Sequence, residues 1–137
     1  MKKRSHNILP EQIEIVVANW DAVEVYPHRF GGREFSLMNR EFGHIHVHGI
    51  VDIPFSRKIR DQLIADGMAT RHHFLPETGW VTVPVDESTE LEQVLKILRF
   101  SYLLHRIKQN SDTLKAVAEL ETLGLSQELQ QLVVPAE

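Results

Sequence analysis

The stretch from Glu41 to Phe55 restricts the fold of this chain more than any other, because its residue types alternate. In a β-strand successive side chains point to opposite faces of the sheet, so this alternation predicts one half-buried strand over the whole stretch. The apolar row requires a core behind it, and the polar row then faces away from that core. The apolar row is Ile45, Val47, Val51 and Ile53, and the polar row is His44, His46, His48 and Asp52.

The polar row concentrates histidine. Three of the eight histidines in the chain lie on it, at positions 44, 46 and 48. With a rise of about 3.3 Å per residue, neighbouring imidazoles on the row are about 7 Å apart along the strand, which allows them to converge on one ion or ligand. The spacing therefore predicts a functional site on this strand without naming its chemistry.

Composition narrows the class of protein. A chain of 137 residues can bury a core as one domain, and we expect residues 1–137 to form a single domain. The absence of Cys excludes disulfides and thiolate metal sites, and it fits a cytoplasmic protein. No apolar run approaches the roughly 20 residues of a membrane span, and a net charge of −4 argues against binding to nucleic-acid phosphates. We therefore expect neither a membrane nor a nucleic-acid partner.

Periodicity along the chain predicts an α+β fold. The expected architecture is a largely antiparallel five-stranded sheet with helices covering one face, plus a C-terminal helical tail. Residues 1–110 would form the core of the domain and residues 111–137 an accessory tail. The predicted strands are 22–30, 33–38, 41–55, 70–75 and 80–85; the predicted helices are 10–20, 56–67, 89–109 and two short ones beginning near Ser111 and Ser126.

The sheet face opposite the helices is expected to be open, polar and aromatic. Strand parity places Tyr26, His28, Asp52 and Trp80 on it, and we expect these four side chains to face a small-molecule ligand. Either His72 or His73 should join the same face from the fourth strand.

Two segments of the chain resemble a known family. Glu41-Phe-Gly-His44-Ile-His46 is followed, after a predicted helix, by Gly67-Met-Ala-Thr-Arg-His72. This pair of motifs resembles the luciferase domain family of bacteria and fungi, and the resemblance extends over residues 20 to 105. It implies a functional site made of the matching residues Glu41, His44, His46 and His72. A weaker likeness, in layout alone, is to YjbR-like and CyaY-related α/β domains.

The first functional hypothesis is a divalent metal such as Zn²⁺, Mn²⁺ or Ni²⁺. Histidine is the commonest metal ligand, and a His-x-His pair on one strand suits a site with nitrogen and oxygen ligands. Glu41 has odd parity, whereas the histidines are even, so only a β-bulge near Gly43 would bring it to their face. Glu41 can instead orient an imidazole from behind. The candidate ligands are His44 and His46, with a third from His48, His72 or Glu41.

Two other hypotheses need no metal. In one, a neutral histidine acts as general base, with Glu41 raising its basicity and His72 donating to an oxyanion. In the other, the polar row is a solvent-facing surface or the contact surface of a non-enzymatic protein-interaction module. The helical tail is expected to pack on the domain or on a second copy of the chain, as in a homodimer. At this point all these alternatives stay open.

Overall fold

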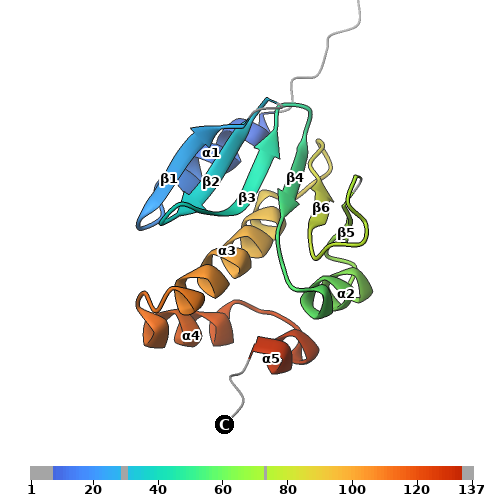
Figure 1. The fold of residues 1–137 in the computed structure, drawn as a ribbon. Coiled ribbons are helices and arrows are strands. Elements are labelled where there is room, and N and C mark those ends of the chain that lie inside the picture. The colour runs from blue at the N-terminus through green and yellow to red at the C-terminus, as the bar shows by residue number, and fades with distance from the viewer. Residues whose placement is uncertain (1–7, 29–30, 73, 134–137) are drawn as a thin grey trace, which may run out of the picture.

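The computed structural model describes residues 8–28, 31–72 and 74–133, which form five helices and one six-stranded sheet. The ribbon in Figure 1 has the sheet above and the two C-terminal helices below. The predicted α+β class is confirmed. In chain order the elements are α1 (Leu9–Ala18), β1 (Val23–Pro27), β2 (Arg33–Leu37), β3 (Arg40–His46), β4 (Ile50–Ile53), α2 (Arg57–Ala65), β5 (Thr70–Arg71), β6 (Val81–Pro84), α3 (Leu91–Lys108), α4 (Thr113–Thr122) and α5 (Gln127–Val133).

The sheet is antiparallel at every pairing, with the strand order β1-β2-β3-β4-β6-β5. The prediction of one strand over 41–55 is wrong, because the chain turns back at residues 47–49 and β4 pairs with β3. Gly49 has a φ of +93°, a conformation that favours glycine, and its amide donates to the carbonyl of His46 at 3.1 Å. The described sheet therefore has six strands rather than the predicted five.

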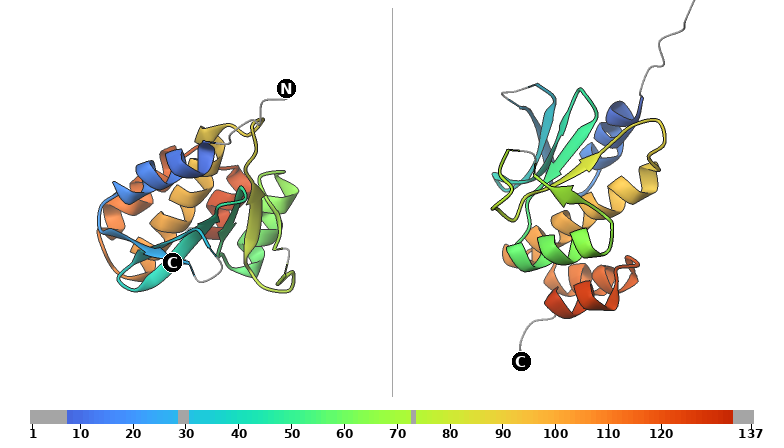
Figure 2. Two further views of the ribbon diagram at one scale, coloured as in Figure 1. Left: turned by 90° about the horizontal axis from the view of Figure 1, so that it is seen from above. Right: turned by 90° about the vertical axis from the view of Figure 1, so that its right-hand side faces the viewer.

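Helices α1 and α3 cover one face of the sheet, as the sequence predicts (Figure 2). Helix α3 lies close against β3 at Gly43, where an added Cβ would lie 2.7 Å from Leu98 Cδ2. Leu98 and Val51 are fully buried. Val47, predicted in the same apolar row, is instead 67% exposed because it lies in the turn after β3. The apolar side chains that alternate along the strands thus face the helices.

The predicted strand 70–75 is shorter than expected, since β5 comprises only Thr70–Arg71. Just after it, His72 Nδ1 accepts hydrogen bonds from the amides of Phe74 and Leu75, at 3.1 and 3.0 Å, and this local bonding replaces the pairing of a longer strand. Two expectations fall outside the described residues, namely His73 as the alternative to His72 and the end of the first strand at residues 29–30.

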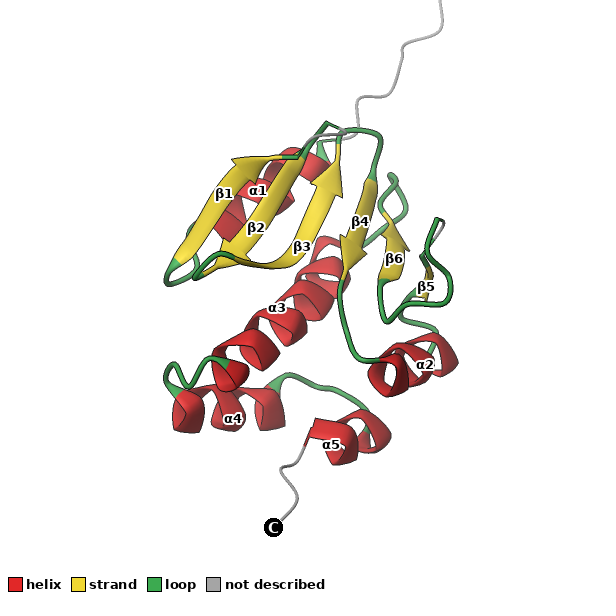
Figure 3. Cartoon of the chain, viewed as in Figure 1, coloured by secondary structure: helices red, strands yellow, loops and turns green. Residues whose placement is uncertain are grey.

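The C-terminal helices pack on the rest of the chain (Figure 3). Arg99 of α3 donates to the carboxylate of Glu119 in α4 at 2.7 Å, and Ser126, just before α5, donates to Asp66 at 2.7 Å. Leu129 of α5 is fully buried. The tail therefore extends the core beneath α3 and α2. In the described part of the chain, no helix combines the length and apolar character needed to cross a membrane.

Candidate functional site

One row of polar side chains runs across the sheet on the face away from α1 and α3. The strands are in register at these positions, so each residue lies directly opposite the next. Directly opposed residues have Cβ atoms about 4.5–5.5 Å apart, which brings their polar ends within reach of one another. From β1 to β5 the row is Tyr26, Glu34, His44, Asp52, Thr82 and Thr70.

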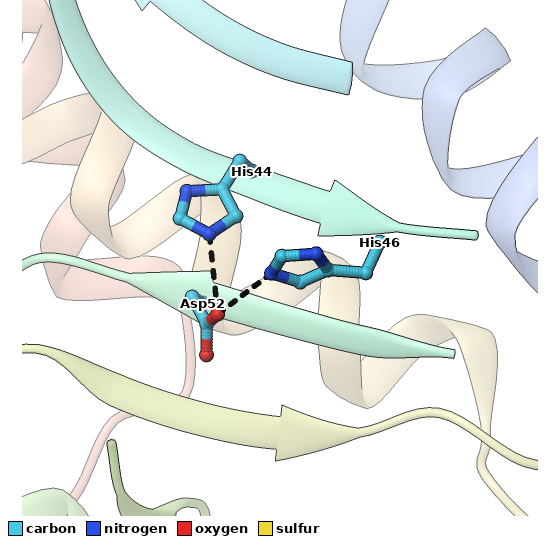
Figure 4. Close-up of side chains that lie close together, drawn as sticks. All are labelled: His44, His46 and Asp52. Carbon is cyan, nitrogen blue, oxygen red and sulfur yellow. Dashed lines mark hydrogen bonds and ion pairs between the residues drawn. The ribbon is translucent and has the colours of Figure 1, made fainter. Parts of the chain in front are cut away.

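Asp52, in the middle of this row, is the centre of a hydrogen-bonded cluster. Figure 4 shows His44 and His46 pointing from β3 toward the Asp52 carboxylate on β4. Nε2 of His44 lies 3.1 Å from Asp52 Oδ2, and Nε2 of His46 lies 3.0 Å from the same oxygen. The other oxygen, Oδ1, accepts a hydrogen bond from the hydroxyl of Thr82 at 2.7 Å. Three adjacent strands thus surround one fully buried carboxylate.

Glu41 reaches this cluster through a β-bulge in β3. Phe35 of β2 pairs with Gly43, and the next residue, Ser36, pairs with Glu41. Phe42 of β3 therefore has no partner on β2 and is the extra residue of the bulge. Its carbonyl accepts a hydrogen bond from Ser101 of α3 at 2.8 Å. Beyond the bulge, Glu41 Oε2 lies 2.6 Å from His44 Nδ1. The bulge that the sequence requires near Gly43 is therefore present, and Glu41 lies behind His44.

His72 approaches the same carboxylate from the chain after β5. Its Nε2 lies 3.4 Å from Asp52 Oδ2, while its Nδ1 accepts the two amide hydrogen bonds described above. The structure thus brings together the three histidines that the sequence places in one site, His44, His46 and His72. Each has a ring nitrogen within 3.4 Å of a single oxygen atom.

The charges of the cluster fix the position of a proton. Burial alone lowers the pKa of His44, but hydrogen bonds to Asp52 and Glu41 and the charges of these carboxylates outweigh it and raise this pKa to about 9. Burial would raise the pKa of Asp52, but hydrogen bonds from His44 and Thr82 outweigh it and hold this pKa far below its ordinary value. Without a metal, His44 is therefore an imidazolium between two carboxylates at neutral pH.

Aromatic rings cover the cluster, so the expectation of an open sheet face is wrong at this site. The His28 ring stacks on His44 with centroids 4.1 Å apart, and the Trp80 ring lies 5.4 Å from His44. The side chains of His44 and His72 are each 9% exposed, against 16% for His46. His46 is therefore the most exposed of the three histidines, although it too is largely covered.

Two residues of the predicted site lie apart from the cluster. His48 is exposed in the turn between β3 and β4, so the expectation that it continues the histidine row is wrong. Tyr26, at the β1 end of the polar row, is 39% exposed, and its hydroxyl donates to Glu24. The other predicted ligand-facing residues, His28, Asp52 and Trp80, do lie at the cluster.

Within the described ranges, one group of side chains has the geometry to hold a metal ion, and it consists of His44, His46 and Asp52. The ligand atoms of these three residues all lie within 4.8 Å of one another. Sequence reasoning placed Asp52 among the residues facing a small molecule and missed it as a candidate metal ligand. It also missed Thr82 as the residue that orients this carboxylate.

Fold and cluster together define an α+β domain with a buried histidine–aspartate site that can hold a metal. Residues 39–101 match the family model described as Luciferase domain. The matched segment contains Glu41, His44, His46 and His72, and it confirms the resemblance predicted from these residues.

The fold also resembles a solved structure, that of Deinococcus radiodurans protein DR2400, which has a DUF419 family-model domain. The TM-score is 0.58 at 19% sequence identity, and the alignment covers 85% of this chain and 88% of that chain. At this identity the likeness shows the fold alone. No curated protein sequence matches the chain.

Proposed function

We propose that this domain binds one divalent metal ion between His44, His46 and Asp52 and uses it to bind or transform a small molecule. The observation that carries the proposal is that both Nε2 atoms lie 3.0 to 3.1 Å from one oxygen, Asp52 Oδ2. Around a metal with bonds of about 2.1 Å, neighbouring ligand atoms are separated by about 3.0 Å in octahedral and about 3.4 Å in tetrahedral geometry. The two histidine–aspartate distances fit such a site.

The residues behind the ligands support the same proposal. Glu41 is hydrogen-bonded to Nδ1 of His44, and Thr82 donates to Oδ1 of Asp52. One candidate ligand on β3 and one on β4 are thus oriented by hydrogen bonds at the atoms that would not bind the metal. Metal-bound histidines commonly donate their other ring N–H to a carboxylate, which fixes the tautomer and makes the ligand more basic. Two histidines and one carboxylate also leave coordination positions open for water or substrate. The ligand set therefore favours a metal that takes part in chemistry.

A second candidate function uses the cluster as a metal-free acid–base site. His44, with its pKa raised to about 9, carries a proton between two carboxylates and can act as a general acid. In addition, every buried side-chain polar atom of the described residues has a hydrogen-bond partner, so the cluster is satisfied as it stands. This observation favours a site that functions without an ion.

Calorimetric titration of tag-free protein with Zn²⁺, Mn²⁺ and Ni²⁺ distinguishes the two candidates. Wild type is expected to bind one ion, and His46→Ala and Asp52→Asn are expected to bind it at least about 100-fold more weakly, since each loses a ligand. The matched control is His48→Ala, because His48 is exposed in the turn that follows the same strand, and its affinity should equal that of wild type. Circular dichroism checks that each variant is folded.

The opposite result is equally clear. Heats of titration that are the same for wild type, His46→Ala and His48→Ala would reject the metal site. The acid–base function would then be the better account of the cluster.

A further inference from the structure

The hydrogen bonds of His72 determine which of its two ring nitrogens carries the hydrogen. Nδ1 accepts from the amides of Phe74 and Leu75, at 3.1 and 3.0 Å, so its lone pair is engaged by the turn. A neutral imidazole has one N–H, and with Nδ1 as acceptor that N–H is at Nε2. A hydrogen on Nδ1 would instead point at the hydrogens of the two amides. His72 therefore presents an N–H, not a lone pair, to the Asp52 carboxylate.

This N–H lies at the oxygen that the other two histidines also approach. Nε2 of His72 is 3.4 Å from Asp52 Oδ2, and the Nε2 atoms of His44 and His46 are 3.1 and 3.0 Å from it. A metal ligand must offer a lone pair, and Nε2 of His72 offers a hydrogen. We infer that His72 is not a ligand of the proposed ion but a positioning residue, which acts through Asp52 by donating to Oδ2. This inference rests on the proposed function and divides the three histidines into two ligands and one donor.

The two oxygens of Asp52 are then oriented by different donors. The hydroxyl of Thr82 donates to Oδ1 at 2.7 Å, and Nε2 of His72 lies at Oδ2. A carboxylate oxygen has two lone pairs, so Oδ2 keeps one for an ion after it has accepted from His72. Removal of a hydrogen-bond partner of a metal ligand typically weakens metal binding by about 10- to 100-fold. His72 should therefore affect the affinity for the ion without touching it.

The turn that holds His72 is itself anchored on α2, which lies beside β5 in Figure 1. Arg60 of α2 is buried and donates to the carbonyl of Thr78 at 2.6 Å. The hydroxyl of Thr78 in turn donates to the carbonyl of Leu75 at 2.7 Å. Because the Leu75 amide is one of the two that bind Nδ1, the orientation of the His72 ring is held by contacts that reach back to α2.

A matched pair of variants separates the two nitrogens of His72. His72→Asn keeps an acceptor near the position of Nδ1, so it preserves the turn, but it has no donor that reaches Asp52. His72→Gln places an N–H near the position of Nε2. Calorimetry on the full-length chain measures the affinity for Zn²⁺. Nitrogen NMR of the histidine side chains in wild type, before and after addition of Zn²⁺, shows which ring nitrogens carry a hydrogen.

The expected results are specific for a donor. When Zn²⁺ is added, Nε2 of His72 should keep its hydrogen, whereas Nε2 of His44 and of His46 should carry none. Zn²⁺ affinity should fall about 10- to 100-fold in His72→Asn and return to within about threefold of wild type in His72→Gln, which restores the donor. A side chain that served only to hold the turn would give the opposite order, because Asn is the variant that keeps the acceptor.

Each failure has its own meaning. Zn²⁺ that leaves the nitrogen signals of His44 and His46 unchanged would overturn the proposed function together with this inference. If these two histidines bind the ion and Nε2 of His72 also loses its hydrogen, His72 is a ligand and only this inference falls. Equal affinities in wild type and His72→Asn, or equal losses in both variants, would likewise overturn the donor role alone. The spectra need wild type alone, so a variant that does not fold leaves this test intact.

Discussion

Raising the pH above neutrality is expected to destabilise the metal-free protein through His44. The pKa of this imidazole rises from 6.5 to about 9 on folding, because the hydrogen bonds and charges of Asp52 and Glu41 outweigh the effect of burial. Folding therefore favours the protonated form, and this contribution is fully present below pH 6.5 and lost as the pH rises through 9. The shift corresponds to roughly 3 kcal/mol of unfolding free energy. The lowered pKa of Asp52 stabilises the fold at every pH well above its ordinary value of 3.8, and this contribution is lost only in acid, so it stays constant between pH 6.5 and 9.

Urea unfolding in the presence of a chelator, at steps from pH 6 to pH 10, measures the loss directly. In Glu41→Gln the amide oxygen still accepts the hydrogen bond from His44 Nδ1, but the charge is gone. The decrease in unfolding free energy between pH 6.5 and 9 should therefore be smaller than in wild type by about 1 kcal/mol or more. The control is Glu121→Gln, because Glu121 is exposed on α4. Its unfolding free energy should decrease between pH 6.5 and 9 by the same amount as that of wild type.

The assignment of a proton to His44 fails if the unfolding free energy of wild type is the same at pH 6.5 and pH 9.5. In that case His44 would be neutral in the folded protein, and the cluster would hold one negative charge more than described above. If Glu41→Gln and wild type lose the same non-zero amount, the charge of Glu41 does not contribute to the raised pKa of His44, and Asp52 alone accounts for it.

Four further outcomes are expected. Zn²⁺ must displace the proton of His44, so its affinity, measured by calorimetry, should rise about tenfold per pH unit toward pH 9. Leu98→Ala should lower the unfolding free energy by about 2–5 kcal/mol, since the side chain is fully buried, and a loss below about 0.5 kcal/mol would contradict its place under the sheet. Gly43→Ala should cost about 1–3 kcal/mol in the same assay, because its Cβ would meet Leu98 at 2.7 Å. A chain ending at Asn110 should unfold at a lower urea concentration, since it loses the buried Leu129. Sedimentation would first establish that both chains are monomers, and an unchanged urea midpoint would then contradict the packing of the tail.

Local periodicity predicted much of this fold. Alternation gave the inward faces of the strands, and the spacing of apolar residues gave α3 at Leu91–Lys108, close to the predicted 89–109. The bulge was predictable for a similar reason. Glu41 has the wrong parity for the histidine face, and Gly43 follows two residues later, so a site containing Glu41 required the strand to gain one residue there.

The role of Asp52 was not predicted because it depends on where the chain turns. A strand over 41–55 would exceed the usual length of about 3–10 residues, and Gly49 interrupts its pattern, so both signs of a turn were in the sequence. Reading one long strand placed Asp52 on the correct face but well beyond His44, instead of directly opposite it. No local sequence pattern predicts that His28 and Trp80 cover the site. Their rings reach His44 because the sheet brings together strands that are distant in the sequence.

The site depends on the register between β3 and β4. His44 lies opposite Asp52, and because side chains alternate along a strand, a shift of one residue would turn Asp52 toward α3 and bring Val51 to the histidine face. That shift would bury a carboxylate without partners and expose an apolar side chain to polar groups, and both effects are unfavourable.

Residues without chemistry of their own hold this register. Gly49 allows the tight turn, the bulge at Phe42 sets the parity of Glu41, and Ser101 satisfies the carbonyl that the bulge leaves unpaired in the ladder. Gly43 lets α3 lie close enough to cover the strand from the other side. The polar cluster and the backbone that positions it are thus parts of one arrangement. Substitutions at these backbone positions should impair the site even though none of these residues has a side chain in the polar cluster.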